Sequence, residues 1–228
     1  MARRRFRFAV VARWVGLAGL ALLLIFAGLV ALYTVARPVS TLMLGRLATG
    51  RSYERNYVRL ADIAPIAVAS VIASEDDGFC KNDGVDWDAL HAVVSRAGKR
   101  GPSRGASTIT MQTAKNLFLW PGRSTIRKGI EIGVALVLGQ VWSKARTVEV
   151  YLNIAEWGDG VFGIEAAAQR YFHKRASQLT AREAALLATS LPNPIKRNAA
   201  RPSPMQRILA ARIVARAGAG DELDCLPQ

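Results

Sequence analysis

The apolar residues of the chain are concentrated in one uncharged run near the N-terminus. No charged residue occurs between Arg13 and Arg37, and leucine, isoleucine, valine and phenylalanine fill the middle of residues 14–36. About 20 apolar residues are enough to span the hydrocarbon core of a bilayer. Trp14 and Tyr33 stand near the two ends of the run, where amphipathic rings favour the membrane interface. The pattern therefore predicts a transmembrane helix over residues 14–36.

A basic tail precedes this run and predicts its orientation. Residues 1–13 carry no acidic residue and five arginines: Arg3, Arg4, Arg5, Arg7 and Arg13. Positive charge tends to stay in the cytoplasm, so everything after residue 36 should lie outside the cell membrane. A cleaved signal peptide is the alternative, but the run is long for the apolar core of one, and no small-x-small cleavage motif follows where it is expected. We therefore expect a retained, single-pass anchor.

The rest of the chain has the apolar spacing of helices. A linker is predicted over residues 37–54, a helical domain over 55–217 and a tail over 218–228. The helical segments of the domain are residues 60–74, 86–98, 107–119, 124–142, 146–154, 163–171, 180–191 and 204–217. Asp86, Ser107 or Thr108, and Ser124 are suitable N-caps for three of them. No period-2 run is long enough to predict a sheet, so we expect an all-α fold.

Composition narrows the class of protein further. The chain has 31 Lys and Arg against 17 Asp and Glu, a net charge of +14, and its 51% hydrophobic content excludes a disordered chain. Two cysteines and two histidines argue against a disulfide-stapled scaffold, a zinc module and a His-based metal centre. A basic surface beside a bilayer attracts anionic head groups and phosphorylated ligands. Nucleic acid, the other partner such charge suggests, would rarely meet an external domain; a role in solubility alone is the alternative.

An acidic segment follows the first predicted helix of the domain. Glu75 ends an apolar helix, and Asp76, Asp83 and Asp86 come soon after it. A carboxylate that emerges from an apolar helix into a cleft is partly desolvated, which raises its basicity and suits a general base. The alternative is a solvated acidic turn in which Asp86 only caps the next helix.

Two basic segments could bind phosphate. Ser107 and Thr108 stand at a predicted helix start, where free N–H groups favour an anion, and Lys115 lies about two turns further on. Arg127 and Glu131 share one helix face, so the cations could neutralise a phosphorylated leaving group while Glu131 orients them or holds a magnesium ion. The alternatives are an ordinary serine cap with a solvated lysine, and a weak surface ion pair.

The order and spacing of these segments resemble the family 51 glycosyltransferases, the peptidoglycan glycosyltransferases. The matching residues are Glu75-Asp-x-x-Phe79 with Gly84-x-Asp86, Gly105-Ala-Ser-Thr-Ile-Thr-x-Gln112-x-x-Lys115-Asn116, Arg127-Lys-x-x-Glu131, and Lys144 through Glu149-x-Tyr151-Leu-Asn153 to Gly158. Since no transpeptidase domain follows, the chain looks like the monofunctional biosynthetic form. The resemblance implies an all-α, lysozyme-like glycosyltransferase domain preceded by a single transmembrane helix, with a smaller lobe that dips into the membrane.

The resemblance also implies a reaction. Glu75 matches the catalytic base, which would deprotonate the sugar 4-hydroxyl of an incoming lipid II molecule as that oxygen attacks the anomeric carbon of a growing glycan held as an undecaprenyl diphosphate. The α linkage becomes a β-1,4 bond, so one inverting displacement suffices and no covalent intermediate is needed. The diphosphate leaving group needs positive charge rather than a general acid.

Each matching residue takes a role from the resemblance. Substrate binding would fall to Ser107, Thr108, Gln112, Lys115, Asn116, Arg127 and Lys128. Glu131 matches the second essential carboxylate and is the candidate ligand of a divalent cation, Mg²⁺ or Mn²⁺. Asp86, Lys144 and Glu149 are expected to support the fold. Asn82 departs from the family, which usually has His there; Asn keeps a donor and an acceptor but carries no proton, and we expect it to orient the loop.

The resemblance places the protein in the cell inner membrane, with its N-terminus in the cytoplasm and its catalytic domain in the periplasm. Its expected partners are lipid II, the growing lipid-linked glycan, the membrane, and other cell wall synthesis and division proteins, with no nucleic acid. Cys80 and Cys225 would then lie in an oxidising compartment, but their wide separation in sequence gives no reason to pair them.

Two other functions stay open at this stage. A lysozyme-like hydrolase or lytic transglycosylase would need an acid for its sugar leaving group and would have no use for phosphate-binding residues such as Ser107, Lys115 and Arg127. A basic, membrane-tethered binding module would make Glu75 dispensable.

Overall fold

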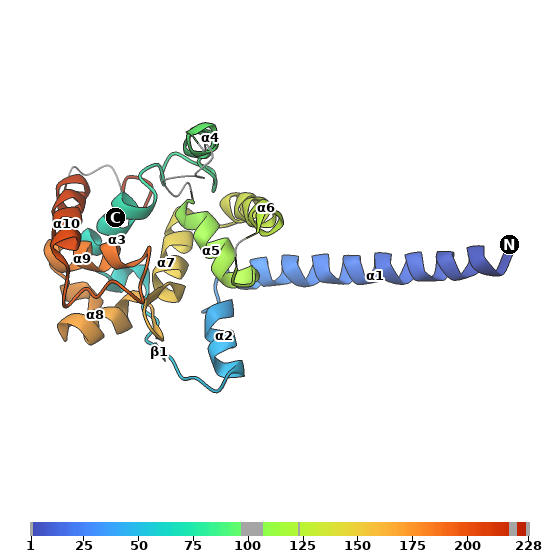
Figure 1. Ribbon diagram of the computed structural model, residues 1–228, viewed down its shortest axis with the longest axis horizontal. Helices are drawn as coiled ribbons and strands as arrows, with labels where there is room; N and C mark the ends of the chain where they lie inside the picture. The colour runs from blue at the N-terminus through green and yellow to red at the C-terminus, as the bar shows by residue number, and fades with distance from the viewer. Residues whose placement is uncertain (1, 97–106, 123, 219–222, 227–228) are drawn as a thin grey trace. The chain divides into compact units, whose positions relative to one another are not determined.

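The chain forms two compact units, Met1–Arg37 and Pro38–Gln228. This computed structural model describes residues 2–96, 107–122, 124–218 and 223–226 (Figure 1). The first unit is one helix, α1 (Ala2–Leu32). Its segment Val11–Leu32 has a mean hydropathy of 2.7 and is long and apolar enough to cross a membrane. The predicted N-terminal apolar helix is therefore confirmed.

Helices also make up most of the second unit. Within the described residues they are α2 (Thr41–Ala48), α3 (Pro65–Glu75), α4 (Trp87–Arg96), α5 (Ile109–Phe118), α6 (Thr125–Val141), α7 (Lys144–Ile154), α8 (Ile164–Phe172), α9 (Ala181–Ser190) and α10 (Pro204–Ala217). Two short 3₁₀ turns, Leu60–Asp62 and Ala176–Gln178, precede α3 and α9. The all-α prediction is confirmed.

Several helices begin at the side chains that the sequence predicts as caps. The hydroxyls of Thr108 and Ser124 accept hydrogen bonds from backbone N–H groups in the first turns of α5 and α6. The Asp86 carboxylate does the same for the N–H of Ala89 at the start of α4. Such caps satisfy N–H groups that have no partner within the helix, and they depend only on residues close in sequence.

The core is built by two groups of packed helices. α3, α9 and α10 pack on one another, and α5 packs against both α6 and α7 (Figure 1). The small buried residues of α3 and α9, among them Ala67 and Ala185, let these helices approach closely. Large buried side chains, led by Trp157, Tyr151 and Phe79, fill the remaining space. α3 is therefore held firmly, and so is the residue at its C-terminal end, Glu75.

The sequence pattern missed two small features. A three-stranded sheet is formed by β1 (Glu54–Arg55), β2 (Glu156–Gly158) and β3 (Val161–Phe162), in the order β1-β3-β2. β1 is parallel and β2 antiparallel to β3. These strands are too short to show alternation, which explains why none was predicted.

The other feature is α2, which lies within the predicted linker. Met43 of this helix is fully buried, and the Thr41 hydroxyl donates to the backbone carbonyls of Asn116 and Leu119 at the end of α5. Residues 41–48 are thus folded onto the helical domain rather than extended. The hydrogen bonds that hold α2 join residues far apart in sequence, so no local sequence pattern predicts them.

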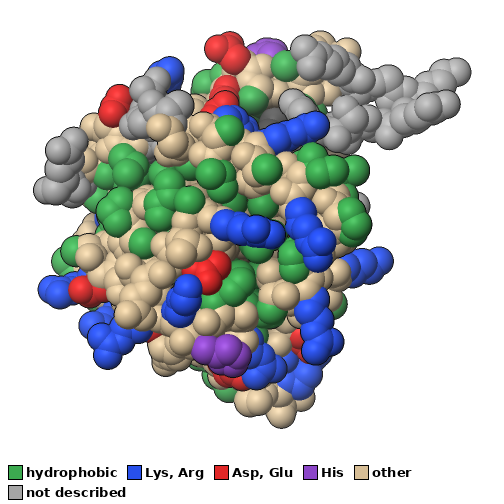
Figure 2. Space-filling model, turned by 90° about the vertical axis from the view of Figure 1, so that its left-hand side faces the viewer, with side chains coloured by type: hydrophobic (Ala, Val, Ile, Leu, Met, Phe, Trp, Pro, Cys, Tyr) green, Lys and Arg blue, Asp and Glu red, His purple; other side chains and the backbone are tan. Residues whose placement is uncertain are grey.

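The basic excess of the sequence appears on the surface of the second unit. Figure 2 shows a face on which Lys and Arg side chains are spread over the middle and lower parts, with few acidic side chains among them and hydrophobic side chains gathered higher up. On α10 the exposed apolar side chains include Met205 and Ile208.

Candidate active site

Glu75 occupies the last position of α3. The helix ends there because Asp76 adopts an extended backbone, with φ −159°. The Glu75 carboxylate accepts a hydrogen bond from Nε2 of Gln112 (3.0 Å) and a longer one from the Ser74 hydroxyl (3.4 Å). Burial raises the pKa of Glu75, and these two donors, with the positive charges of Lys115 and Arg197, oppose that rise. A carboxylate with a raised pKa has the basicity that a general base needs.

Gln112 connects Glu75 to a buried tyrosine. The Tyr151 hydroxyl donates to Oε1 of Gln112 at 3.0 Å, while the amide nitrogen of the same side chain donates to Glu75. The sequence led us to expect Gln112 on sugar or phosphate. Its carboxamide bonds the proposed base on one side and Tyr151 on the other, and its substrate role stays a prediction.

A second carboxylate, Glu131, lies among cations on α6. Arg127 Nη1 is 3.1 Å from Glu131 Oε2, and Lys128 Nζ is 2.6 Å from Oε1. Glu131 is only 2% exposed, so this is a buried ion pair and not the weak surface pair that the sequence left open. Lys128 also donates to the Ser107 hydroxyl at 2.6 Å.

Arg127 retains an unused donor. Its side chain is buried, and its Nε has no hydrogen-bond partner among the described residues. A buried guanidinium N–H without an acceptor is costly, and an anionic ligand would satisfy it.

Lys115 on α5 is close to both carboxylates. Burial lowers the pKa of its ammonium, and the charges that act on it come from Glu131, Arg127, Lys128 and Glu75. Its ammonium makes no hydrogen bond or ion pair with another described residue, in contrast to Lys128. The fold therefore brings the proposed base and the predicted cations into one electrostatic neighbourhood.

Two of the residues predicted to bind substrate are buried and make contacts within the protein. The Thr108 hydroxyl, 2% exposed, donates to the Gly84 carbonyl and caps α5, so its donor is already used. Asn116 is also buried, and its backbone carbonyl accepts from Thr41. Thr108 and Asn116 are thus buried, whereas Ser107 and Lys128 remain partly exposed.

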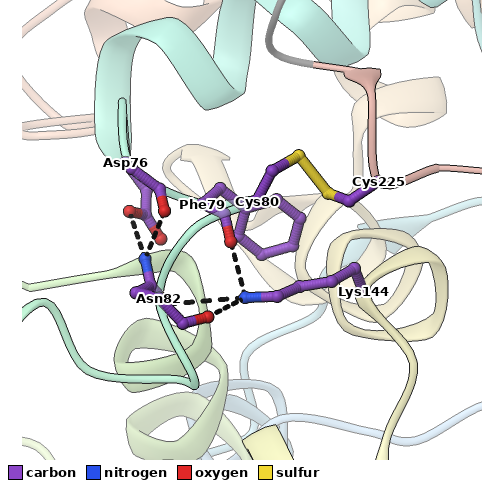
Figure 3. Close-up of a disulfide and its surroundings, with 7 residues drawn as sticks. Asp76, Phe79, Cys80, Asn82, Lys144 and Cys225 are labelled. Carbon is purple, nitrogen blue, oxygen red and sulfur yellow. Dashed lines mark hydrogen bonds between the residues drawn. A yellow bond between two sulfur atoms is a disulfide. The ribbon is translucent and has the colours of Figure 1, made fainter.

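The loop after Glu75 is tied down by short polar contacts (Figure 3). Asp76 accepts from the backbone N–H of Ile109, the first residue of α5, at 2.9 Å, and from the Asn82 amide at 3.0 Å. Burial raises the pKa of Asp76 to about 6. Lys144 donates to the backbone carbonyls of Phe79 and Asn82. Asn82 thus makes several of the hydrogen bonds that fix the loop, which is what a residue that orients the loop would do.

The same loop carries a disulfide that the sequence gave no reason to expect. Cys80 is bonded to Cys225 of the C-terminal tail, with the two Cα atoms 5.4 Å apart (Figure 3). Leu223 and Leu226 beside Cys225 pack against the main core. The pairing depends on how the tail folds back across α3, which spacing along the chain does not reveal.

Glu149 on α7 anchors the chain that leads into α3. It accepts from the Tyr57 hydroxyl and the Leu60 N–H, both at 2.9 Å, and pairs with Arg146 at 2.6 Å. Lys144 in turn bonds the loop after Glu75, so the contacts of both residues described here are with the fold.

The described residues offer no cluster of metal ligands. Within the part of the chain that the structure describes, no three His, Cys, Asp or Glu side chains come together to hold an ion. Both oxygens of Glu131 already bond cations, and a further cation there would be repelled by Arg127 and Lys128. Glu131 alone therefore does not fit a bound divalent ion, and we assign no step to one.

Sequence reasoning missed two residues of the site. Arg197, which follows α9, acts electrostatically on Glu75 and donates to the Thr189 carbonyl at 2.8 Å. Tyr151 belongs to a matching motif but was assigned no role. Only the three-dimensional structure links Tyr151 to Glu75 through Gln112 and brings the charge of Arg197 to bear on Glu75.

The helical fold, one helix apolar enough to cross a membrane, and a basic carboxylate near a cluster of cations are features that fit a membrane-attached glycosyltransferase. Residues 42–217 match the family described as Transglycosylase. The chain therefore belongs to the transglycosylase family.

Individual relatives agree with this assignment. A biosynthetic peptidoglycan transglycosylase of Brucella suis is 56% identical over 197 residues, covering 86% of this chain and 87% of that protein. One from Agrobacterium fabrum is 50% identical over 222 residues, covering 96% and 98%. One from Nitrobacter winogradskyi is 47% identical over 214 residues, covering 93% and 95%. These similarities extend over nearly the whole chain.

Proposed function

We propose that this transglycosylase polymerises lipid II into β-1,4-linked glycan strands of the cell wall, by inverting transfer with release of undecaprenyl diphosphate. Family membership and the peptidoglycan transglycosylases among its relatives support a role in peptidoglycan synthesis. The observation that carries the proposal is the electrostatic environment of Lys115. The charges that act on its ammonium come both from Glu75 and from the cluster of Arg127, Lys128 and Glu131.

In the proposed reaction Glu75 removes the proton from the acceptor 4-hydroxyl. Its raised pKa favours this step, because a more basic carboxylate is a better proton acceptor. The oxygen then attacks the anomeric carbon of the donor, and the bond to the diphosphate breaks. The proton resides on Glu75 and the electron pair on the leaving diphosphate.

The cations would receive the negative charge that develops on the diphosphate. Arg127 has a buried Nε without a partner among the described residues, and the partly exposed Lys115 has an ammonium that bonds no other described residue. Preorganised donors of this kind stabilise charge in a site from which water is excluded. Glu131 holds Arg127 and Lys128 in place through its two ion pairs.

Hydrolysis of finished glycan is the less favoured reaction. It would need a second carboxylic acid to protonate a sugar leaving group. Asp76, the carboxylate next to Glu75 in sequence, has its oxygens bonded to the Ile109 N–H and the Asn82 amide. The phosphate-type donors around Lys115 would be unused.

The proposed setting is the inner membrane, crossed once by α1, with the N-terminus in the cytoplasm and the catalytic domain in the periplasm. The arginines of residues 1–13 and the apolar segment Val11–Leu32 support this orientation. Lipid-linked substrates and the membrane itself are then the immediate partners.

The test is a polymerisation assay with the full chain in detergent and lipid II as substrate. Wild-type protein should form glycan strands, and Glu75→Gln should lower the rate by about 100- to 10,000-fold, which is the usual contribution of a general base. Glu54→Gln on β1, an exposed carboxylate paired with Arg170, is the matched control and should leave the rate unchanged. Glycan formation by Glu75→Gln at the wild-type rate would exclude Glu75 as the base.

A further inference from the structure

Tyr151 is a buried tyrosine whose hydroxyl makes one hydrogen bond in the site. It lies on α7, is 1% exposed, and donates its hydroxyl hydrogen to Oε1 of Gln112 at 3.0 Å. The ring packs in the main core with Phe79 and Trp157. Filling the core would require only the ring, so a phenylalanine would serve equally well for packing.

The hydroxyl bond fixes which way the Gln112 carboxamide points. A carboxamide has an acceptor oxygen at one end and a donor nitrogen at the other. Because Tyr151 donates to the oxygen, the nitrogen faces Glu75, where it donates to Oε2 at 3.0 Å. If the group turned over, its oxygen would face the ionised carboxylate and repel it.

We propose that Tyr151 is a positioning residue for the base: it holds the Gln112 carboxamide with its N–H toward Glu75, and so sets the orientation and basicity of that carboxylate. This role rests on the proposed function, in which Glu75 takes the acceptor proton. Tyr151 itself touches no substrate. Its effect passes through Gln112 alone.

The other charged groups around Glu75 are independent of Tyr151. Lys115 faces the carboxylate from α5, and Arg197 faces it from the segment after α9; both lower its pKa. On α7, Tyr151 is the titratable group that faces it, and burial together with the charges of Glu75 and Asp76 keeps the pKa of this phenol well above its ordinary value. Tyr151 is therefore neutral at any working pH and acts only as a hydrogen-bond donor.

Tyr151→Phe removes one oxygen atom and frees the Gln112 carboxamide. Glu75 then loses an oriented donor that favours its ionised form, so its pKa should rise further and the base should stay protonated to a higher pH. We expect the acid limb of the kcat/KM profile for lipid II polymerisation to move up by about one pH unit. At pH values below the acid limb the rate should fall by about 10-fold and recover as the pH is raised above the limb, while KM at high pH changes less than about twofold.

Tyr171→Phe is the matched control. It also removes a phenolic hydroxyl, one that donates to the Trp157 carbonyl at 3.3 Å and has no bond to the site. Its pH profile should equal that of the wild type. An acid limb for Tyr151→Phe that coincides with that of Tyr171→Phe would overturn the proposal.

A double-mutant cycle tests the route through Gln112. Gln112→Met keeps the length of the side chain but removes both hydrogen bonds, so it should shift the acid limb at least as far as Tyr151→Phe. Adding Tyr151→Phe to Gln112→Met should then cause no further shift. Additive shifts would overturn the proposed route. Tyr151→Phe could melt at a much lower temperature than the wild type. Gln112→Met then still tests the proposal, because an unshifted acid limb for Gln112→Met alone would contradict the role of the Gln112 bond.

A readout without turnover separates this proposal from the proposed function. The carboxyl carbon of Glu75, assigned by comparison with Glu75→Gln in ¹³C-glutamate-labelled protein, reports the pKa of this group directly. That pKa should rise in Tyr151→Phe whether or not the protein polymerises lipid II. A wild type that makes no glycan contradicts only the proposed function, whereas an unchanged carboxyl titration in Tyr151→Phe contradicts only the positioning role.

Discussion

Two glutamates of the site, the partly buried Glu75 and the fully buried Glu131, are held in opposite ways. Glu75 accepts hydrogen bonds from the neutral side chains of Gln112 and Ser74, and its cations act on it without a direct bond. Glu131 bonds two cations directly, Arg127 and Lys128. The carboxylate of Glu75 is thus left more basic, whereas the negative charge of Glu131 is neutralised by its ion pairs.

The difference suggests how the two roles are divided. A carboxylate without a direct cationic partner resists ionisation when buried and is ready to take a proton, whereas a carboxylate in two ion pairs is fixed as an anion that organises cations. Lys115 lies within the influence of both groups. The environment, rather than the residue type, assigns the proposed base to Glu75.

Neutralising each glutamate should therefore have opposite effects on stability, and this is the largest difference we predict. Glu131→Gln leaves Arg127 and Lys128 without their anion and should lower the free energy of unfolding by about 3–5 kcal/mol. Glu75→Gln removes only a carboxylate whose ionised form is disfavoured by burial, so the fold should be equally stable or more so. Chemical denaturation of both variants in detergent measures this contrast.

The pH dependence of the same measurement gives an independent check. The pKa of Glu75 is raised in the folded state, so ionisation costs stability as pH rises above the ordinary value of the group. The stability of Glu75→Gln relative to wild type should therefore be greater at about pH 8 than at about pH 5. Equal losses of stability for Glu75→Gln and Glu131→Gln would show that the two sites do not differ as described.

The Glu75 region also has a covalent constraint that the Glu131 region lacks among the described residues. The Cys80–Cys225 bond ties the loop after Glu75 to the tail. Replacing both cysteines with serine should lower the free energy of unfolding by about 2–4 kcal/mol, because the bond closes a long loop in the unfolded chain. Thermal melting with and without a reductant measures the effect. A reductant that shifts the melting of the wild type but leaves the double variant unchanged would assign the effect to this bond.

Sequence reasoning succeeded where local chemistry decides the structure. The apolar run at residues 14–36 and the caps Thr108 and Ser124 depend on neighbours along the chain, and the structure contains the corresponding helices. The resemblance pointed to Glu75, Lys115 and the Arg127 segment, which do converge. Their catalytic roles stay predictions until the variants are assayed.

What escaped the sequence depends on distant contacts. α2 is held by bonds from Thr41 to the end of α5, and the Cys80 bond needs the tail to fold back on the loop. The hydrogen bond from Gln112 to Glu75 likewise joins α5 to the end of α3, two segments well separated along the chain. Neither the spacing of residues along the chain nor their secondary-structure propensity predicts these arrangements.

The smallest predicted effect concerns Arg197, the cation that acts on Glu75 but is not among the charges acting on Lys115. Arg197→Met keeps the apolar stem and removes the charge, so the pKa of Glu75 should rise slightly. Because the interaction is indirect, the acid limb of the kcat/KM profile should move up by only about 0.3 pH unit. Arg212→Met on the exposed face of α10 is the control for loss of one positive charge. A shift for Arg197→Met no larger than that of Arg212→Met would show that Arg197 does not lower the pKa of Glu75. Lys115 would then be the cation that lowers this pKa, and Lys115 is also the cation on which the Glu131 cluster acts.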